Sequence, residues 1–129
     1  MAVVSDHMAR DLVTVAPGEL LGAAAKLMAE RKVGAALILD DSRLIGILSE
    51  RDVLRAVAAG GAESAPVSTW MTPNPETIEP DDSLDHAAVL MIHGGFRHLP
   101  VVDGGRAVGI LSIRDLVRVA LDDSAPRGA

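Results

Sequence analysis

The sequence predicts a mixed α/β (α+β) fold made of two β-α-β-β-α repeats that pack about a pseudo-twofold axis. Three observations predict it. Residues 8–55 align with residues 71–118 without a gap, the apolar spacing alternates between helical and extended periods, and the chain has only 129 residues. A unit of about 50 residues buries too little surface to be stable alone. We therefore expect one folded object in which the sheets of the two copies pack against each other.

The duplication has a constant offset of 63 residues, with 17 identities in 48 aligned positions. In each copy, a short Val-, Thr- or Ile-containing stretch closed by a proline predicts a strand, because the residue before proline avoids helical angles. Leu, Ala and Met at three- and four-residue spacing then predict a helix. Two aliphatic runs joined by turn residues predict a hairpin, and a second helix follows. The expected elements are strands 13–15 and 77–78, helices from Leu20 and Leu84, hairpins 36–49 and 99–112, and helices from Glu50 and Ile113.

The helix ends and faces carry further expectations. Asp81, Asp82 and Ser83 are the N-cap candidates for the first helix of the second copy. The last helix of each copy should have an apolar face that packs on its sheet. The residues expected on these buried faces are Val53, Leu54 and Val57 in the first copy, and Leu116, Val117 and Ala120 in the second.

The repeat also sets the expected boundaries along the chain. The first motif is expected over residues 1–58 and the second over residues 70–121. Residues 59–69, with the sequence AGGAESAPVST, are small, glycine-rich and broken by a proline, which is typical of a linker. Residues 122–129 have no apolar period and are expected to form a flexible tail.

Composition narrows the classes of function. The net charge of −6 argues against nucleic acid or an anionic membrane as a partner, because both bind basic surfaces. The aromatic content of 2% also argues against nucleic acid, because too few aromatic side chains are present for successive bases to stack on. No apolar run is long enough for a membrane span, and no secretory signal is expected. The absence of cysteine excludes disulfides and thiolate metal sites and is compatible with the reducing cytoplasm, where we expect the protein.

Three ordered motifs identify a family. The sequences Gly-Ile-Leu-Ser-Glu-Arg-Asp at 46–52 and Gly-Ile-Leu-Ser-Ile-Arg-Asp at 109–115 have the form G-h-h-[ST]-x-x-D. Met-Thr-Pro at 71–73 and Arg-His-Leu-Pro-Val-Val-Asp at 97–103 are two further landmarks. Together they resemble CBS domains, and because the resemblance covers nearly the whole chain, the protein looks like a stand-alone tandem CBS pair, a Bateman module.

The resemblance implies a regulatory module that binds an adenosine-containing ligand, such as AMP, ADP, ATP or a related adenosyl compound, in clefts between the two motifs. It also implies a homodimer, with ligand binding transmitted to dimer or partner geometry. No cofactor is implied. By position, Asp52 and Asp115 match the ribose-binding aspartate. The expected phosphate or ribose contacts are Ser49, Ser112, Arg51, Arg114, Arg97 and His98. The expected adenine pocket comprises Thr14, Val15, Val33, Gly34, Thr77, Ile78 and Phe96.

The Ser-x-x-Asp pattern supports this chemistry without the family name. A helix start offers unpaired N–H groups to an anion, and a carboxylate in the first turn can accept hydrogen bonds from the two hydroxyls of a ribose. The same pattern is also a helix cap, in which the serine binds the helix N–H groups and no ligand is needed. A ligand-independent dimerisation or docking module is therefore the alternative function.

The two clefts are expected to be unequal. Arg97 and His98 precede a strand of the second copy, whereas Val33 and Gly34, before the matching strand of the first copy, bring no cation. Glu50 adds a carboxylate to the first-copy site, where it would oppose a phosphate. We therefore expect residues of the second copy to make most phosphate contacts. Which Asp shares a cleft with Arg97 and His98 stays open at this point.

Catalysis has no support in the sequence. There is no nucleophile with a Ser–His–acid arrangement, no phosphate-binding loop of the G-x-x-x-x-G-K-[ST] form and no histidine spacing for a metal. His86 and His93 lie seven residues apart on a helix without a third ligand. We therefore expect a protein that is not an enzyme and holds no metal.

Overall fold

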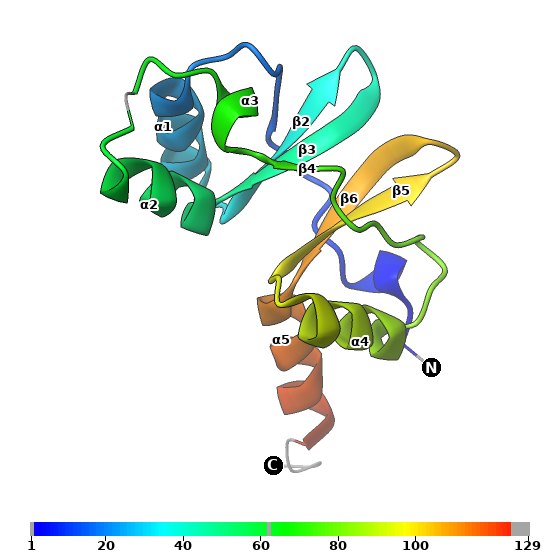
Figure 1. Ribbon diagram of the computed structural model, residues 1–129. Helices are drawn as coiled ribbons and strands as arrows, with labels where there is room; N and C mark the ends of the chain where they lie inside the picture. Colours follow the sequence, from blue (N-terminus) through cyan, green and yellow to red (C-terminus); the bar gives the residue numbers. More distant parts are fainter. Residues whose placement is uncertain (1, 62, 125–129) are drawn as a thin grey trace.

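The computed structural model describes residues 2–61 and 63–124 (Figure 1). It contains the predicted mixed α+β arrangement, with each hairpin flanked by helices. Two short helices, η1 and α3, were not predicted. The elements are η1 (Val4–Asp6), β1 (Thr14–Val15), α1 (Leu21–Arg31), β2 (Ala35–Asp40), β3 (Arg43–Ser49), α2 (Glu50–Ala58), α3 (Val67–Trp70), β4 (Thr72–Pro73), α4 (Leu84–Gly94), β5 (His98–Asp103), β6 (Arg106–Ser112) and α5 (Ile113–Ser124).

Two sheets are related by the 63-residue offset. The first has the order β1-β2-β3-β4, with β1 parallel to β2 and the other neighbours antiparallel. The second sheet has β5 and β6 as its named strands, extended by single bridges from Ile78 to Val101 and from Ala9 to Ile110. These bridges match the β1–β2 and β3–β4 pairings of the first sheet position by position. The internal symmetry therefore includes strand register.

Chain segments are exchanged between the two repeats. Val4 and Met8, from the start of the chain, pack in the core of the second repeat against Met91, Leu99 and Leu111. In Figure 1, the blue N-terminal helix lies beside α4 and the second hairpin rather than beside α1. Each repeat therefore completes its core with a segment that precedes the other repeat.

The counterpart of this exchange occupies the first repeat. Val67 of α3 is completely buried there, in a cluster that includes Leu48 and Ala56, and β4 pairs with β3. Gly46 shows why the segment fits, because a Cβ at this position would collide with the Met71 side chain and lie 3.2 Å from the Thr72 carbonyl oxygen. The expected boundaries at residues 58 and 70 thus differ from the limits of the two cores, because Val67 belongs to the first core and Val4 to the second.

A third apolar cluster joins the repeats. Ala35, Leu37 and Ile47 of the first sheet are buried, and Ala107 and Ile110 of the second sheet pack against them. In Figure 1, the two hairpins lie side by side, as this contact requires. The expectation that the two sheets pack against each other is confirmed.

The predicted faces of the last helices are wrong in part. Val53 and Leu116 do pack against the cores, but Leu54 is 68% exposed, Val57 66% and Val117 50%; Ala120 is also exposed. On α2, Asp52 and Ala56 are buried instead. The buried side of α2, at positions 52, 53 and 56, is thus shifted by one residue from the predicted positions 53, 54 and 57.

The end of the chain also differs from the expectation. Helix α5 continues to Ser124, so residues 122–124 of the expected tail are helical. Residues 125–129, the rest of that expected tail, lie outside the described residues.

Removing methyl groups from Val4 tests the exchange of segments. Val4→Ala should lower the free energy of unfolding by about 2 kcal/mol, because it leaves a cavity in a core where Val4 has no exposed surface. Val57→Ala makes the same chemical change on the exposed side of α2 and should alter stability by less than about 0.5 kcal/mol. Urea unfolding followed by circular dichroism measures both. Equal effects of the two changes would contradict the assignment of the N-terminal segment to the second core.

Candidate functional site

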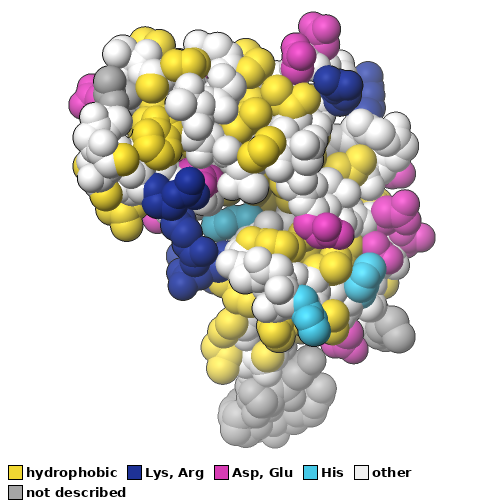
Figure 2. Space-filling model, viewed as in Figure 1, with side chains coloured by type: hydrophobic (Ala, Val, Ile, Leu, Met, Phe, Trp, Pro, Cys, Tyr) yellow, Lys and Arg dark blue, Asp and Glu magenta, His cyan; other side chains and the backbone are white. Residues whose placement is uncertain are grey.

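A cleft of about 290 Å³ opens where the start of α2 faces residues of the second repeat. One wall carries Ser49, Asp52 and Arg55 from the β3–α2 junction, and the opposite wall carries Phe96 and Arg97. Figure 2 shows the same region as a group of dark-blue basic side chains beside a histidine, between α2 and the second repeat. Arg97 and His98 therefore share a cleft with Asp52 of the first repeat.

A capping box fixes the start of α2. The Asp52 backbone N–H donates to Ser49 Oγ at 3.2 Å, and the Ser49 backbone N–H donates to Asp52 Oδ2 at 2.8 Å. Ser49 Oγ also donates to Asp52 Oδ2 at 3.0 Å. The helix-cap interpretation of the Ser-x-x-Asp pattern is thus correct at the level of local structure. It leaves the second carboxylate oxygen for other contacts.

That second oxygen, Asp52 Oδ1, faces two other donors. Arg55 Nη1 lies 3.0 Å from Asp52 Oδ1. Thr72 Oγ1, which belongs to β4, lies 3.5 Å from the same oxygen. The Asp52 side chain is only 3% exposed, whereas that of Arg55 is 59% exposed. A buried carboxylate needs such partners, because an unpaired charge away from water is costly.

The second repeat contains the same cap. Ser112 and Asp115 reproduce the three contacts at 2.8, 3.0 and 3.2 Å, and Arg118 lies 3.7 Å from Asp115. The Asp115 side chain is 15% exposed, more than that of Asp52. The two predicted ribose-binding aspartates are therefore equivalent in geometry but not in burial.

The loops before β2 and β5 hold the starts of the last helices in both repeats. The Glu50 backbone N–H donates to the Gly34 carbonyl oxygen, and the Ile113 N–H donates to that of Arg97, both at 2.9 Å. Arg51 Nη1 lies 3.5 Å from the Gly95 carbonyl oxygen, so this side chain crosses from α2 to the loop before β5. Of these contacts, the one made by Arg51 joins the two repeats.

His98 is partly buried between the starts of α2 and α5. Burial lowers the pKa of its imidazole from the ordinary value of 6.5 and outweighs the carboxylates of Glu50 and Asp115, which raise it. Arg97 and Arg114 lower the pKa further. The neutral form is therefore favoured near pH 7, where His98 is a hydrogen-bonding group rather than a cation.

The structure brings six of the sequence-predicted site residues into this cleft: Ser49, Arg51, Asp52, Phe96, Arg97 and His98. Gly34 adjoins it, since a Cβ there would lie 3.0 Å from His98 Nε2. The remaining candidates, which do not line it, are Thr14, Val15, Val33, Thr77, Ile78, Ser112, Arg114 and Asp115.

Two residues of the expected adenine pocket have buried side chains. Val15 and Ile78 are only 5% and 3% exposed, and their side chains pack in the first and second cores. Both residues belong to sheet pairings, in which alternate side chains point inward. Their side chains are therefore turned away from the surface, and an adenine contact through the backbone of these segments stays a prediction.

Sequence reasoning missed several lining residues. Arg55, which matches Arg118 at the 63-residue offset, was not predicted to be the partner of Asp52, although their three-residue spacing on a helix allows that contact. Thr72, Pro75 and Glu76 also line the cleft. Thr72 lies within the Met-Thr-Pro landmark, so the motif was visible, but its placement depends on the crossing of the chain.

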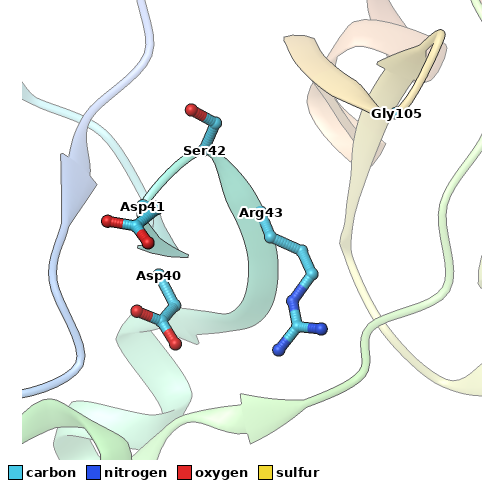
Figure 3. A pocket seen from close by; sticks show the side chains of 5 residues that line it. All are labelled: Asp40, Asp41, Ser42, Arg43 and Gly105. Carbon is cyan, nitrogen blue, oxygen red and sulfur yellow. The ribbon is translucent and has the colours of Figure 1, made fainter.

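A second hollow lies at the tips of the hairpins. Figure 3 shows Asp40, Asp41, Ser42 and Arg43 on the β2–β3 turn, facing Gly105 on the β5–β6 turn. These lining residues are exposed, and the hollow, of about 520 Å³, is open. Over the described ranges, no group of three or more His, Cys, Asp or Glu side chains is arranged to hold a metal ion. The same ranges contain no helix long and apolar enough to cross a membrane.

Comparison with known proteins identifies the family. The model of the CBS domain matches residues 4–59 and again residues 67–122. The chain is 37% identical over 117 residues to the CBS domain-containing protein YhcV of Bacillus subtilis, covering 90% of this chain and 84% of that protein. This protein therefore belongs to the CBS domain family, as a tandem pair.

Two similar solved structures contain adenosine compounds. The CBS domain pair of protein MJ0100, in complex with 5'-methylthioadenosine and S-adenosyl-L-methionine, superposes with a TM-score of 0.90 at 26% identity, covering 96% of this chain and 99% of that one. CBSX2 in complex with AMP superposes with a TM-score of 0.81 at 31% identity, covering 97% of this chain and 100% of that one. Pairs of this fold thus bind adenosine-containing ligands.

The lowered pKa of His98 predicts a pH dependence of stability. Folding favours the neutral imidazole of His98, because its pKa is lower in the folded protein than in the unfolded chain. The resulting contribution to the free energy of unfolding is fully present above the pKa of the unfolded histidine. It is lost as the pH falls from there through the lower pKa of the folded state. The wild type should therefore lose more unfolding free energy than His98→Gln between about pH 7.5 and about pH 5. Urea titrations at each pH measure this.

His93→Gln, which replaces an exposed histidine near the end of α4, is the control and should behave as the wild type does. Identical pH profiles of the wild type and His98→Gln would contradict the assignment.

Proposed function

We propose that this protein is a regulatory module that binds an adenosine-containing ligand in the cleft between α2 and the loop before β5. The observation that carries the proposal is the buried Asp52 carboxylate, which lines this cleft beside Arg51 and Arg97. The adenosine compounds bound by MJ0100 and CBSX2 support it. The proposed role is to sense a ligand rather than to catalyse a reaction. The cytoplasmic location stays a prediction.

The proposal gives each wall of the cleft a part of the ligand to bind. Asp52 Oδ1 is the oxygen not used by the cap, and it can accept a hydrogen bond from a ribose hydroxyl in place of the long contact from Thr72. A phosphate would lie near the start of α2, between Arg51 and Arg97. Ile47, Pro75 and Phe96 offer apolar surface to an adenine ring.

The segment of α3 and β4, which packs on the first repeat, offers a way for ligand binding to change the conformation of the protein. Thr72 contacts Asp52 and lies in β4, one residue after Met71, whose side chain packs over Gly46. Trp70 is adjacent, at the end of α3. A ribose that displaced Thr72 would shift this segment and the start of the second repeat, which follows it. Such a shift is the proposed signal to a dimer or protein partner.

Two observations favour the alternative function, a ligand-independent dimerisation or docking module. The caps satisfy Asp52 and Asp115 without a ligand, and apolar side chains are exposed on three helices: Leu54 and Val57 on α2, Val89 and Ile92 on α4, and Val117 on α5. A ligand-independent module would use such surfaces for homodimerisation. Light scattering with and without nucleotide separates the two proposals, because the alternative requires a dimer whose mass and stability do not respond to adenosine compounds.

Changing Asp52 tests the proposed function. Asp52→Asn keeps an oxygen for the cap but removes the charge from the proposed ribose contact, which should weaken adenosyl binding at least about tenfold. Calorimetric titration of the wild type and the variant with adenosine, AMP, ATP and S-adenosylmethionine measures the effect.

Asp115→Asn is the matched control, because it makes the same change in the same capping box of the other repeat. It should leave affinity for the Asp52 cleft within about threefold of the wild type. Thermal unfolding of both variants separates loss of binding from loss of the cap. Unchanged affinity in Asp52→Asn, or no binding of any of these compounds by the wild type, would refute the proposal.

A further inference from the structure

The cleft carries as many carboxylates as guanidinium groups, and this balance limits the charge of its ligand. We propose that Glu50 makes the cleft selective for adenosyl compounds with at most one phosphate over those with two or three. The inference rests on the proposed function and specifies the ligand class of the same site. Glu50, Asp52 and Glu76 line the cleft together with Arg51, Arg55 and Arg97.

The existing ion pair reduces the positive charge that a ligand meets. Arg55 lies 3.0 Å from the buried Asp52 carboxylate, so its charge is already compensated. Arg51 and Arg97 remain, and Glu50 and Glu76 oppose them in the same cleft. His98 adds no full charge near pH 7, because burial lowers its pKa. A triphosphate would bring several negative charges into a cleft without net positive charge.

The position of Glu50 makes it the more important of the two opposing carboxylates. It occupies the first turn of α2, where the helix dipole favours a negative charge. The Glu50 carboxylate therefore already compensates the positive end of the helix, which would otherwise attract a phosphate. Its Oε1 and His98 Nε2 both lie against Gly34, at 2.6 Å and 3.0 Å from the position of an added Cβ. The carboxylate thus lies beside His98, the first residue of β5, whose side chain was expected to bind phosphate.

The second repeat lacks this charge. Ile113 occupies the position that matches Glu50, at the same place after the strand and before the same Arg-Asp pair. The carboxylate is therefore not required by the fold or by the capping box. It is a property of one cleft, and a chemical reason for it is the exclusion of additional phosphates.

The test compares AMP and ATP, without magnesium, by calorimetric titration of the wild type, Glu50→Gln and Glu50→Ile. The wild type should bind AMP more tightly than ATP. Both variants should raise ATP affinity about five- to tenfold, and AMP affinity by about twofold, because the repulsion grows with the number of phosphate charges. The gain should shrink in about 0.5 M salt, since Glu50 is exposed to solvent.

Glu63→Gln is the control, because it removes the same charge from an exposed side chain of the connection between the repeats, outside the cleft. It should leave the ratio of AMP to ATP affinity unchanged. An unchanged ratio in both Glu50 variants, tighter binding of ATP than AMP by the wild type, or an equal gain in Glu63→Gln would overturn this inference while the proposed function stands. If no adenosine compound binds the wild type or the variants, both fail.

Discussion

The exchange of core segments between the repeats is the constraint on which the rest of this structure depends. Val4 is completely buried in the second repeat, and Val67 is completely buried in the first. A unit of this size buries little surface by itself, so the segment from outside each repeat adds apolar contacts that the repeat lacks. The exchange also carries Thr72 to within 3.5 Å of Asp52. The segment that completes the core of the first repeat thus also lines the cleft.

The cleft combines local and distant features of the chain. The capping box of α2 is local, since it links residues three apart, and it holds Asp52 in one orientation. The opposite wall, with Phe96 and Arg97, comes from more than forty residues later in the sequence. A ligand between these walls would contact both repeats and so respond to their relative position. This arrangement suits a sensor better than a rigid scaffold, and the balance of charges in the cleft suits a ligand with few phosphates.

Much of the fold could be predicted because its signals are local. The periodicity, the turn residues and the Ser-x-x-Asp caps gave the elements and their order, and the repeat gave the symmetry. The exchange was not predicted, because nothing in a local pattern says which repeat a segment joins. A signal was present, however: Val4-Ser5 and Val67-Ser68 also match at the 63-residue offset. The pairing of Arg97 with Asp52 stayed open for the same reason. The buried face of α2 was placed one residue too late, because an apolar pattern does not show that the charged Asp52 lies on it.

A crystal structure of the protein grown with saturating AMP tests the central claim most directly. The account predicts a nucleotide in the cleft between α2 and the loop before β5, with its ribose hydrogen-bonded to the Asp52 carboxylate and its phosphate between Arg51 and Arg97. A nucleotide found only in the hollow at the hairpin tips, or only beside Ser112 and Asp115, would contradict it.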